Sequence, residues 1–141
     1  MAARFPLIVD GSGTPAIKEI VSGDVLDLTG LQVKLGTEAT LTDGATVAWD
    51  VSASPIAKLT LGGNRTLSAP TNAVGSGQYI SLLVIQDGTG SRTLTWNAAY
   101  EFTADTAPTL TTTANYGDVF TFRYNGTKWL EVGRNLNLVL S

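Results

Sequence analysis

The sequence predicts an all-β protein, an antiparallel β-sandwich of the jelly-roll type with an extended N-terminal arm. Runs rich in valine, isoleucine, leucine, threonine and aromatic residues recur at short intervals, and clusters of glycine, asparagine, aspartate and proline separate them. This succession of strand-length runs and turn signals is typical of a sandwich or barrel. Helical periodicity is nowhere sustained. We therefore expect an arm with short strands over residues 1–35 and a β-sandwich domain over residues 36–141.

The clearest strand lies in residues 118–124, where aromatic residues alternate with valine, threonine and arginine. A period of two places the aromatic side chains on one face, which we expect to be the core face. The Asn125–Gly126 pair that follows is the strongest short-range hairpin signal. We therefore expect residues 128–132 to return antiparallel to this strand, with Trp129 on the face opposite to its neighbour Leu130.

The other strands follow from similar patterns. Residues 78–86 are apolar on both faces, which is typical of a central strand that is covered on both sides. The glycine-rich segment Asp87–Gly90 then supplies a turn, and we expect residues 92–97 to return as a second hairpin. Two upstream runs also alternate, in residues 46–52 and 57–61. Residues 38–135 are thus expected to form one antiparallel unit.

The first 35 residues differ from the rest because glycine and proline interrupt their short apolar runs. Such an extended segment cannot bury apolar side chains without neighbours. We expect this arm to lie on its own sandwich or on another subunit. A charged content of only 15% and a hydrophobic content of 43% suggest that a partner covers some apolar surface, although an average core explains them too.

Composition excludes several classes of chemistry. The chain has no cysteine and no histidine, which removes thiolate metal sites, cysteine nucleophiles and histidine-dependent triads. We expect no catalytic residues, no cofactor and no metal. Nine basic and twelve acidic residues are scattered singly, so we expect no nucleic-acid partner. Because no run approaches the ~20 apolar residues that span a bilayer and no signal peptide is evident, we expect no membrane association and assembly in the cytoplasm.

Several polar features have a functional and a structural interpretation. The segment Asp87–Gly90 could cradle a phosphate, but it lacks the lysine and the following helix of a P-loop, so we favour a turn. Asp24 with Asp27, or Glu38 with Asp43, could bind calcium, but their spacing is not that of a calcium loop, so we favour turn hydrogen bonds. No pair among the twelve carboxylates is marked out for glycoside hydrolysis.

Three tryptophans and four tyrosines could form a platform for sugar rings. Most of them lie at strand positions that alternate as a core requires, so we favour a place in the core or in a subunit interface. Tyr79 and Trp96 are our candidates for the subunit interface.

Two stretches resemble a known class of domain. Residues 59–67 read LTLGGNRTL, and residues 86–96 read QDGTGSRTLTW. With the closing hairpin that begins at Gly117, they resemble domains of virion structural proteins from tailed bacteriophages, over about residues 38–134. The opening RFPLIV of residues 4–9 is similar to the start of phage structural proteins, some labelled tail-fibre and some head proteins.

The resemblance implies a virion component that is assembled in the host cytoplasm. Because the chain has one domain and an arm, without coiled-coil heptads or shaft repeats, we favour a capsid decoration (cement) protein. The resemblance implies that such a protein binds the major capsid protein on the outer capsid surface, commonly as a homotrimer, through many modest contacts that add by multivalency. The expected capsid contacts lie in the arm, at Arg4, Phe5, Leu7, Ile8, Lys18 and Ile20.

Two alternatives remain open at this point. One is a short tail-fibre or tail-tip protein whose loops and aromatic rings bind a host surface glycan. The other is an enzyme such as a glycan depolymerase, for which we expect no activity. Strand order is not written in the periodicity, so sandwich topologies other than the jelly roll also remain open.

Overall fold

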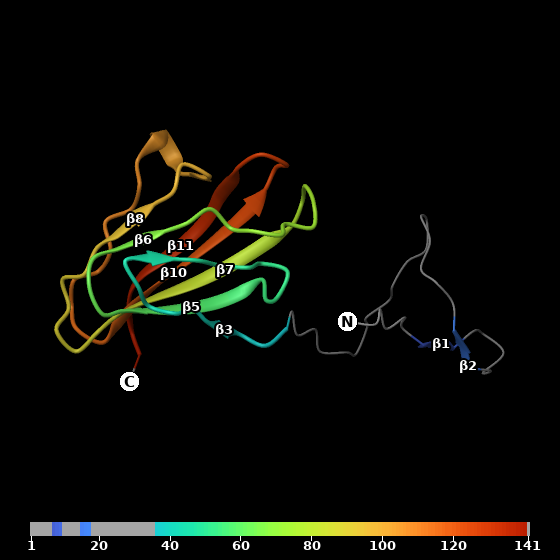
Figure 1. The fold of residues 1–141 in the computed structure, drawn as a ribbon, viewed down its shortest axis with the longest axis horizontal. Helices are drawn as coiled ribbons and strands as arrows, with labels where there is room; N and C mark the ends of the chain where they lie inside the picture. The colour runs from blue at the N-terminus through green and yellow to red at the C-terminus, as the bar shows by residue number, and fades with distance from the viewer. Residues whose placement is uncertain (1–6, 10–14, 18–35, 141) are drawn as a thin grey trace. The chain divides into compact units, whose positions relative to one another are not determined.

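The computed structural model describes residues 7–9, 15–17 and 36–140 (Figure 1). Contacts divide the chain into two units, Met1–Val33 and Lys34–Ser141. In the first unit, two short strands pair antiparallel, β1 (Leu7–Val9) and β2 (Pro15–Ile17). No helix in the described part of the chain is long and apolar enough to cross a membrane.

The second unit contains the remaining strands and one 3₁₀ turn. In chain order these are β3 (Ala39–Thr40), β4 (Thr46–Val47), β5 (Ile56–Leu61), β6 (Arg65–Leu67), β7 (Tyr79–Gln86), β8 (Leu94–Trp96), β9 (Tyr100–Glu101), the 3₁₀ turn η1 (Thr103–Asp105), β10 (Tyr116–Tyr124) and β11 (Trp129–Val139). No α-helix occurs among residues 36–140, so the all-β prediction is confirmed for this unit.

These strands form two sheets. The larger sheet has six strands in the order β3-β5-β7-β10-β11-β9, and the smaller has three in the order β4-β6-β8. Strands β3, β5 and β7 run parallel, as do β4, β6 and β8. The chain passes from the larger sheet to the smaller one after each of β3, β5 and β7, so this part is a flattened coil, similar to a β-solenoid (Figure 1).

The predicted antiparallel jelly-roll sandwich is therefore wrong, because the larger sheet mixes parallel and antiparallel strands and the smaller sheet is parallel. Apolar alternation has the same period of two in parallel and antiparallel strands, so it cannot distinguish them. The second hairpin, expected around Asp87–Gly90, is also wrong, because β7 and β8 belong to different sheets. What looked like a hairpin turn is an arc that carries the chain from one sheet to the other.

The predicted hairpin at Asn125–Gly126 is confirmed. Strand β10 pairs antiparallel with β11, and Tyr124 lies opposite Trp129. The Asn125 side-chain oxygen accepts hydrogen bonds from the backbone N–H groups of Thr127 (2.9 Å) and Lys128 (2.7 Å). Gly126 has a φ of 100°, a conformation that costs glycine little. Local turn chemistry alone sets this connection, which explains why the sequence predicts it.

The core lies between the two sheets. In the larger sheet Leu59 of β5 lies beside Val84 of β7, and in the smaller sheet Val47 lies beside Leu67. All four side chains are at most 2% exposed. Stacking like side chains in register removes apolar surface from water in successive layers, which is the main stabilising contribution of such a coil.

Strand β7 differs from its prediction on one face. Its inward side chains, such as Leu82 and Val84, are buried as expected. Its outward side chains Leu83 and Ile85 are only partly buried, because no strand of residues 36–140 covers that face. Within the described residues, β7 is therefore covered by another sheet on one face only, and not on both faces as predicted.

Candidate functional site

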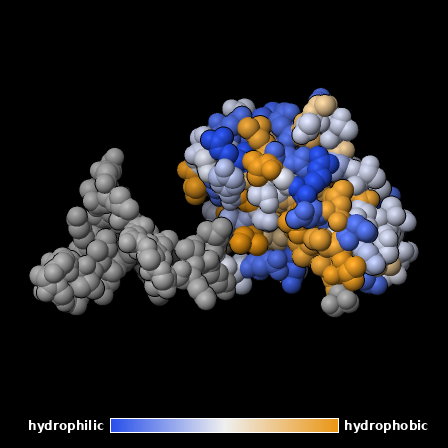
Figure 2. Space-filling view, turned by 180° about the vertical axis from the view of Figure 1, so that it is seen from behind, coloured by the Kyte–Doolittle hydropathy of each residue, from blue (hydrophilic) through white to orange (hydrophobic). Residues whose placement is uncertain are grey.

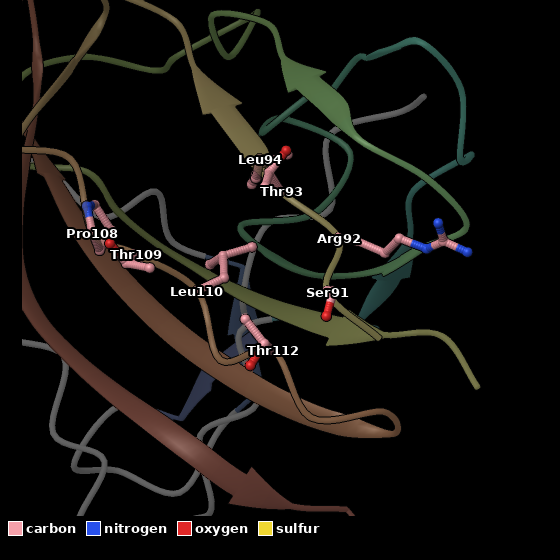
Figure 3. Close-up of a pocket in the computed structure, with 8 residues that line it drawn as sticks. All are labelled: Ser91, Arg92, Thr93, Leu94, Pro108, Thr109, Leu110 and Thr112. Atoms are coloured by element: carbon pink, nitrogen blue, oxygen red, sulfur yellow. The ribbon is translucent and has the colours of Figure 1, made fainter. Parts of the chain in front are cut away.

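A surface groove of about 210 Å³ lies where β8 begins (Figure 3). Residues 91–94 form one wall, and residues 108–112 form the other. Figure 3 shows the two segments running beside each other, with Leu94 and Leu110 between them. Both leucines are more than nine-tenths buried and give the groove an apolar floor.

The first wall is held by hydrogen bonds within the arc between β7 and β8. Asp87 Oδ1 accepts the backbone N–H groups of Thr89 and Gly90, both at 2.9 Å. Gln86 lies at the buried end of β7, where its Oε1 accepts the Arg92 N–H (2.8 Å) and its Nε2 donates to the Arg92 carbonyl (3.0 Å). A buried amide that satisfies both backbone groups of one residue fixes where the arc ends.

The charge of Arg92 is directed away from the groove. Its guanidinium bonds Asp87 Oδ2 at 2.9 Å and points away from residues 108–112 (Figure 3). This hydrogen bond is the main reason why the pKa of Asp87 lies below its ordinary value. Because the acid and the base neutralise each other, the groove presents mainly hydroxyl and apolar groups.

The two walls are joined by backbone contacts at their narrow end. Ser91 N–H donates to the Thr112 carbonyl at 2.8 Å. Gly90, with a φ of 73°, lies so close that a Cβ there would be 2.5 Å from the same carbonyl oxygen. Only glycine permits this approach without a shift of one wall.

Asp118 positions the second wall. Its buried carboxylate accepts the Thr111 N–H at 2.7 Å and the Thr111 hydroxyl at 2.6 Å. It also accepts the Asn137 N–H at 2.9 Å, so one side chain joins residues of the loop, β10 and β11. Hydrogen bonds to a buried charged group are among the stronger ones in proteins, so this wall is held firmly.

The side chains that line the groove are mainly hydroxyl-bearing or apolar. The hydroxyls of Ser91, Thr93, Thr109 and Thr112 line it. No histidine, cysteine or carboxylate does so, and hence the groove has no general base or thiolate nucleophile. The described residues contain no cluster of three or more histidine, cysteine, aspartate or glutamate side chains that could hold a metal ion. At its volume the groove fits part of a ligand, since whole small-molecule pockets have about 300–1,000 Å³.

The residues expected to contact a capsid lie mostly outside the described residues. Arg4, Phe5, Lys18 and Ile20 are among these. Leu7 and Ile8 belong to β1, opposite Ile17 and Ala16 of β2.

The two candidates for a subunit interface, Tyr79 and Trp96, differ in how exposed they are. Tyr79 is 52% exposed and lines a second, apolar groove with Pro55 and Ile56. Trp96 is partly buried and lies in an aromatic cluster, with ring centroids 5.3 Å from Tyr100 and 5.0 Å from Phe120. The structure therefore leaves Tyr79 accessible to a partner, whereas Trp96 packs against the core.

The prediction that the aromatic residues belong to the core is confirmed for Trp49, Tyr100 and Trp129, which are at most 5% exposed. Three buried polar atoms in the described residues have no hydrogen-bond partner: Trp96 Nε1, the Tyr100 hydroxyl and Glu131 Oε1. Burial raises the pKa of Tyr100 far above its ordinary value, so this hydroxyl stays neutral.

Sequence reasoning missed the second wall of the groove. Residues 108–112 contain one proline and three threonines among their five positions, which signals a loop but not its place. Their position depends on Asp118 and on the backbone contact with Ser91, both of which join segments that are separated in the sequence. No local signal could have identified it.

Comparison with known families identifies the class of protein. Residues 37–129 match the model of a family described as "Putative phage tail fibre C-terminal domain". Because the match spans more than half of the chain, the chain belongs to this family. It is a phage structural protein that is associated with the virion, as the sequence predicts. No curated protein sequence shows significant similarity to the chain.

Proposed function

We propose that this chain is a tail-fibre or tail-tip component whose domain binds a host surface glycan without chemical conversion. The observation that carries the proposal is the match of residues 37–129 to a tail fibre C-terminal domain. This match supports the tail-fibre alternative better than our expectation of capsid decoration. The host glycan, rather than the major capsid protein, is then the external partner.

The groove of Figure 3 supports a saccharide as the ligand. Sugar rings present hydroxyls at their edges and C–H groups on their faces, so they need polar partners around an apolar surface. Exposed hydroxyls of Thr93 and Thr109 lie at the rim, and the floor is formed by Leu94 and Leu110. Neutral hydroxyls both donate and accept hydrogen bonds, which matches a neutral sugar.

No described residue provides an observation in favour of capsid decoration. That hypothesis depended on the arm, and most of its contact residues lie outside the described residues. An enzymatic function has no support from the groove either, because no acid–base pair lines it. We therefore propose a binding protein.

Two measurements test the proposal on the intact protein and phage. Immunogold labelling of intact phage particles with antibodies to the domain should place the label on the tail. Purified protein should bind host surface polysaccharide, and the double variant Thr93→Val, Thr109→Val should bind at least about fivefold more weakly, because each lost hydrogen bond contributes about 0.5–1.5 kcal/mol. Thr46→Val, on an exposed strand position away from the groove, is the matched control.

Label on the head would contradict the tail location. Binding that is equal in the double variant and in the control would show that the groove is not the site. Release of reducing sugar from the polysaccharide would contradict the non-enzymatic part of the proposal.

A further inference from the structure

The floor of the groove in Figure 3 is aliphatic, which limits the part of a sugar that can lie on it. Leu94 of β8 and Leu110 of the second wall form this floor, and Pro108 is half-buried beside it. Among the described residues, no aromatic side chain lines the groove. Close contact over a whole sugar face needs a flat surface, whereas a narrow aliphatic floor makes its closest contacts with a small rounded group such as a methyl group.

This floor differs from the other apolar surface of the domain. Figure 2 shows that hydrophobic residues on one face of the domain gather in patches between hydrophilic ones. Large apolar side chains such as Val74 and Val139 are 79% and 63% exposed. Leu94 and Leu110 are only 8% and 7% exposed, because they lie below the two walls. A group that reaches them leaves water more completely than it would on an open patch.

The two walls carry hydroxyl groups above this floor. Thr93 on the first wall and Thr109 on the second wall are exposed. Ser91 is exposed as well, and its φ of 56° is in the left-handed region, which glycine adopts at a lower cost than serine. The backbone conformation therefore does not explain a serine here, and residues in such conformations cluster at ligand-binding sites. A ligand in the groove meets hydroxyls on both sides and leucine side chains below.

The groove offers no free charge to a charged sugar. Arg92 is the one charged residue among the described residues that line it, and Asp87 holds its guanidinium at 2.9 Å. The carboxylate of an acidic sugar would lose water in the groove without gaining a cation, which is unfavourable. An amino sugar with a free ammonium group would likewise find no carboxylate in the lining. Charge therefore favours a neutral sugar.

We propose that the groove binds a neutral sugar residue that carries a methyl group, as a 6-deoxyhexose or an N-acetyl sugar does, with the methyl group on the Leu94–Leu110 floor. This inference rests on the proposed glycan-binding function and specifies its ligand. At about 210 Å³ the groove holds one sugar residue of a longer chain, since whole small-molecule pockets have about 300–1,000 Å³. A hydroxymethyl group on the same floor would bury a hydroxyl without a partner.

Matched sugars test this inference on the full-length chain bound to immobilised host polysaccharide. L-Rhamnose and L-mannose differ only in a methyl or a hydroxymethyl group, as do L-fucose and L-galactose, and N-acetylglucosamine is compared with glucose. In the pair that matches the ligand, the methyl-bearing sugar should displace the protein at an about tenfold lower concentration, because one small apolar group in an apolar pocket contributes about tenfold or more. The pair that responds distinguishes a deoxy sugar from an N-acetyl sugar.

Saturation-transfer NMR shows directly which part of the sugar touches the protein. At about 10 mM sugar, a millimolar Kd suffices for occupancy of the site, and the methyl protons should receive the strongest saturation. This measurement needs no variant, so it tests the inference even if a change in the floor prevents folding.

A variant of the floor tests where the methyl group lies. Leu110→Asn exchanges an apolar floor group for an amide and should abolish the preference, so that both sugars of a pair compete equally. The ratio of two sugars measured on one variant does not depend on how much of that variant is folded. Leu136→Asn, at an exposed position of β11 away from the groove, is the matched control and should keep the preference.

The outcomes separate this inference from the proposed function. Equal competition within all three pairs, or strongest saturation at ring protons, would overturn the methyl contact, while binding of the polysaccharide would leave the proposed function intact. A preference that persists in Leu110→Asn would overturn the assignment to this floor. A natural chain that does not bind host polysaccharide would overturn the proposed function and this inference with it.

Discussion

Asp43 and Arg65 form a two-pronged ion pair across 22 residues of sequence. Arg65 Nε donates to Asp43 Oδ1 at 2.8 Å, and Arg65 Nη2 donates to Oδ2 at 2.7 Å. The pair joins the arc after β3 to the start of β6. Gly62 and Gly63 lie directly against its side chains. A Cβ at Gly62 would lie 2.8 Å from Asp43 Oδ2, and one at Gly63 would lie 2.6 Å from Arg65 Nη1. Successive turns of the coil are thus joined by one charged contact at their edge.

This pair predicts a specific pH dependence. The hydrogen bond from Arg65 holds the pKa of Asp43 below its ordinary value of 3.8. A carboxylate with a depressed pKa contributes stability above its unfolded pKa and loses it as the pH falls through the folded pKa. We expect Asp43→Asn to lower the free energy of unfolding at about pH 6 and to have a smaller effect at about pH 3. Urea unfolding of both proteins at the two pH values measures this, and an equal effect at both would contradict it.

Asp118 should be the most important carboxylate for the stability of the groove. We expect Asp118→Ala to lower the free energy of unfolding by about 2 kcal/mol, because the half-buried Thr111 N–H loses its acceptor and the Asn137 N–H keeps only the Thr111 hydroxyl. Asp105→Ala, at an exposed position, is the control. Urea unfolding measures the difference, and a loss no larger than that of the control would show that the second wall does not depend on Asp118.

Gly90 and Gly88 lie in the same arc between β7 and β8, and we expect alanine substitutions at the two positions to have different effects on stability. Gly90→Ala should lower the free energy of unfolding by about 2 kcal/mol or more, because φ is positive and the new methyl group meets the Thr112 carbonyl. Gly88→Ala meets no atom within 4 Å and should be neutral or slightly stabilising. Thermal unfolding compares the two variants, and similar midpoints would argue against the close contact of the two walls.

The Tyr100 hydroxyl is buried without a hydrogen-bond partner. We expect Tyr100→Phe to raise the free energy of unfolding by about 1 kcal/mol, because it removes an unsatisfied polar group. Tyr124→Phe is the matched control. The Tyr124 hydroxyl donates a hydrogen bond to the Gly126 carbonyl at 2.9 Å, so its removal should lower the free energy of unfolding. Urea unfolding gives both values. Destabilisation by Tyr100→Phe would show that this hydroxyl has a partner in solution.

Part of the candidate site could be predicted from the sequence. The segment Asp87–Gly90 was predicted to be a turn and not a phosphate cradle, and it forms the arc that ends at the groove. Its partner wall was not predicted, because residues 108–112 carry no local pattern and are positioned by Asp118 and Ser91. Turn chemistry acts over a few residues, whereas a groove needs two segments to meet.

The sequence by itself determined the side-chain alternation of the longer strands β5, β7 and β10 and their core-facing apolar side chains. Phe120 and Phe122 alternate as a strand requires, and both are fully buried. Asn125–Gly126 determined the β10–β11 hairpin, because a short turn of special backbone conformation suffices for it. The absence of cysteine and histidine is likewise a property of composition alone.

Only the tertiary structure decided which strands are neighbours. Leu59 lies beside Val84 in parallel strands, although both segments read equally well as antiparallel partners. Side-chain alternation shows which face of a strand is buried and which is exposed. The hydrogen bonds between strands are made by backbone groups that every residue has, so the side chains do not show which strands pair. The path of the chain between the two sheets therefore depends on how the whole set of apolar faces packs together, which no single segment of sequence contains.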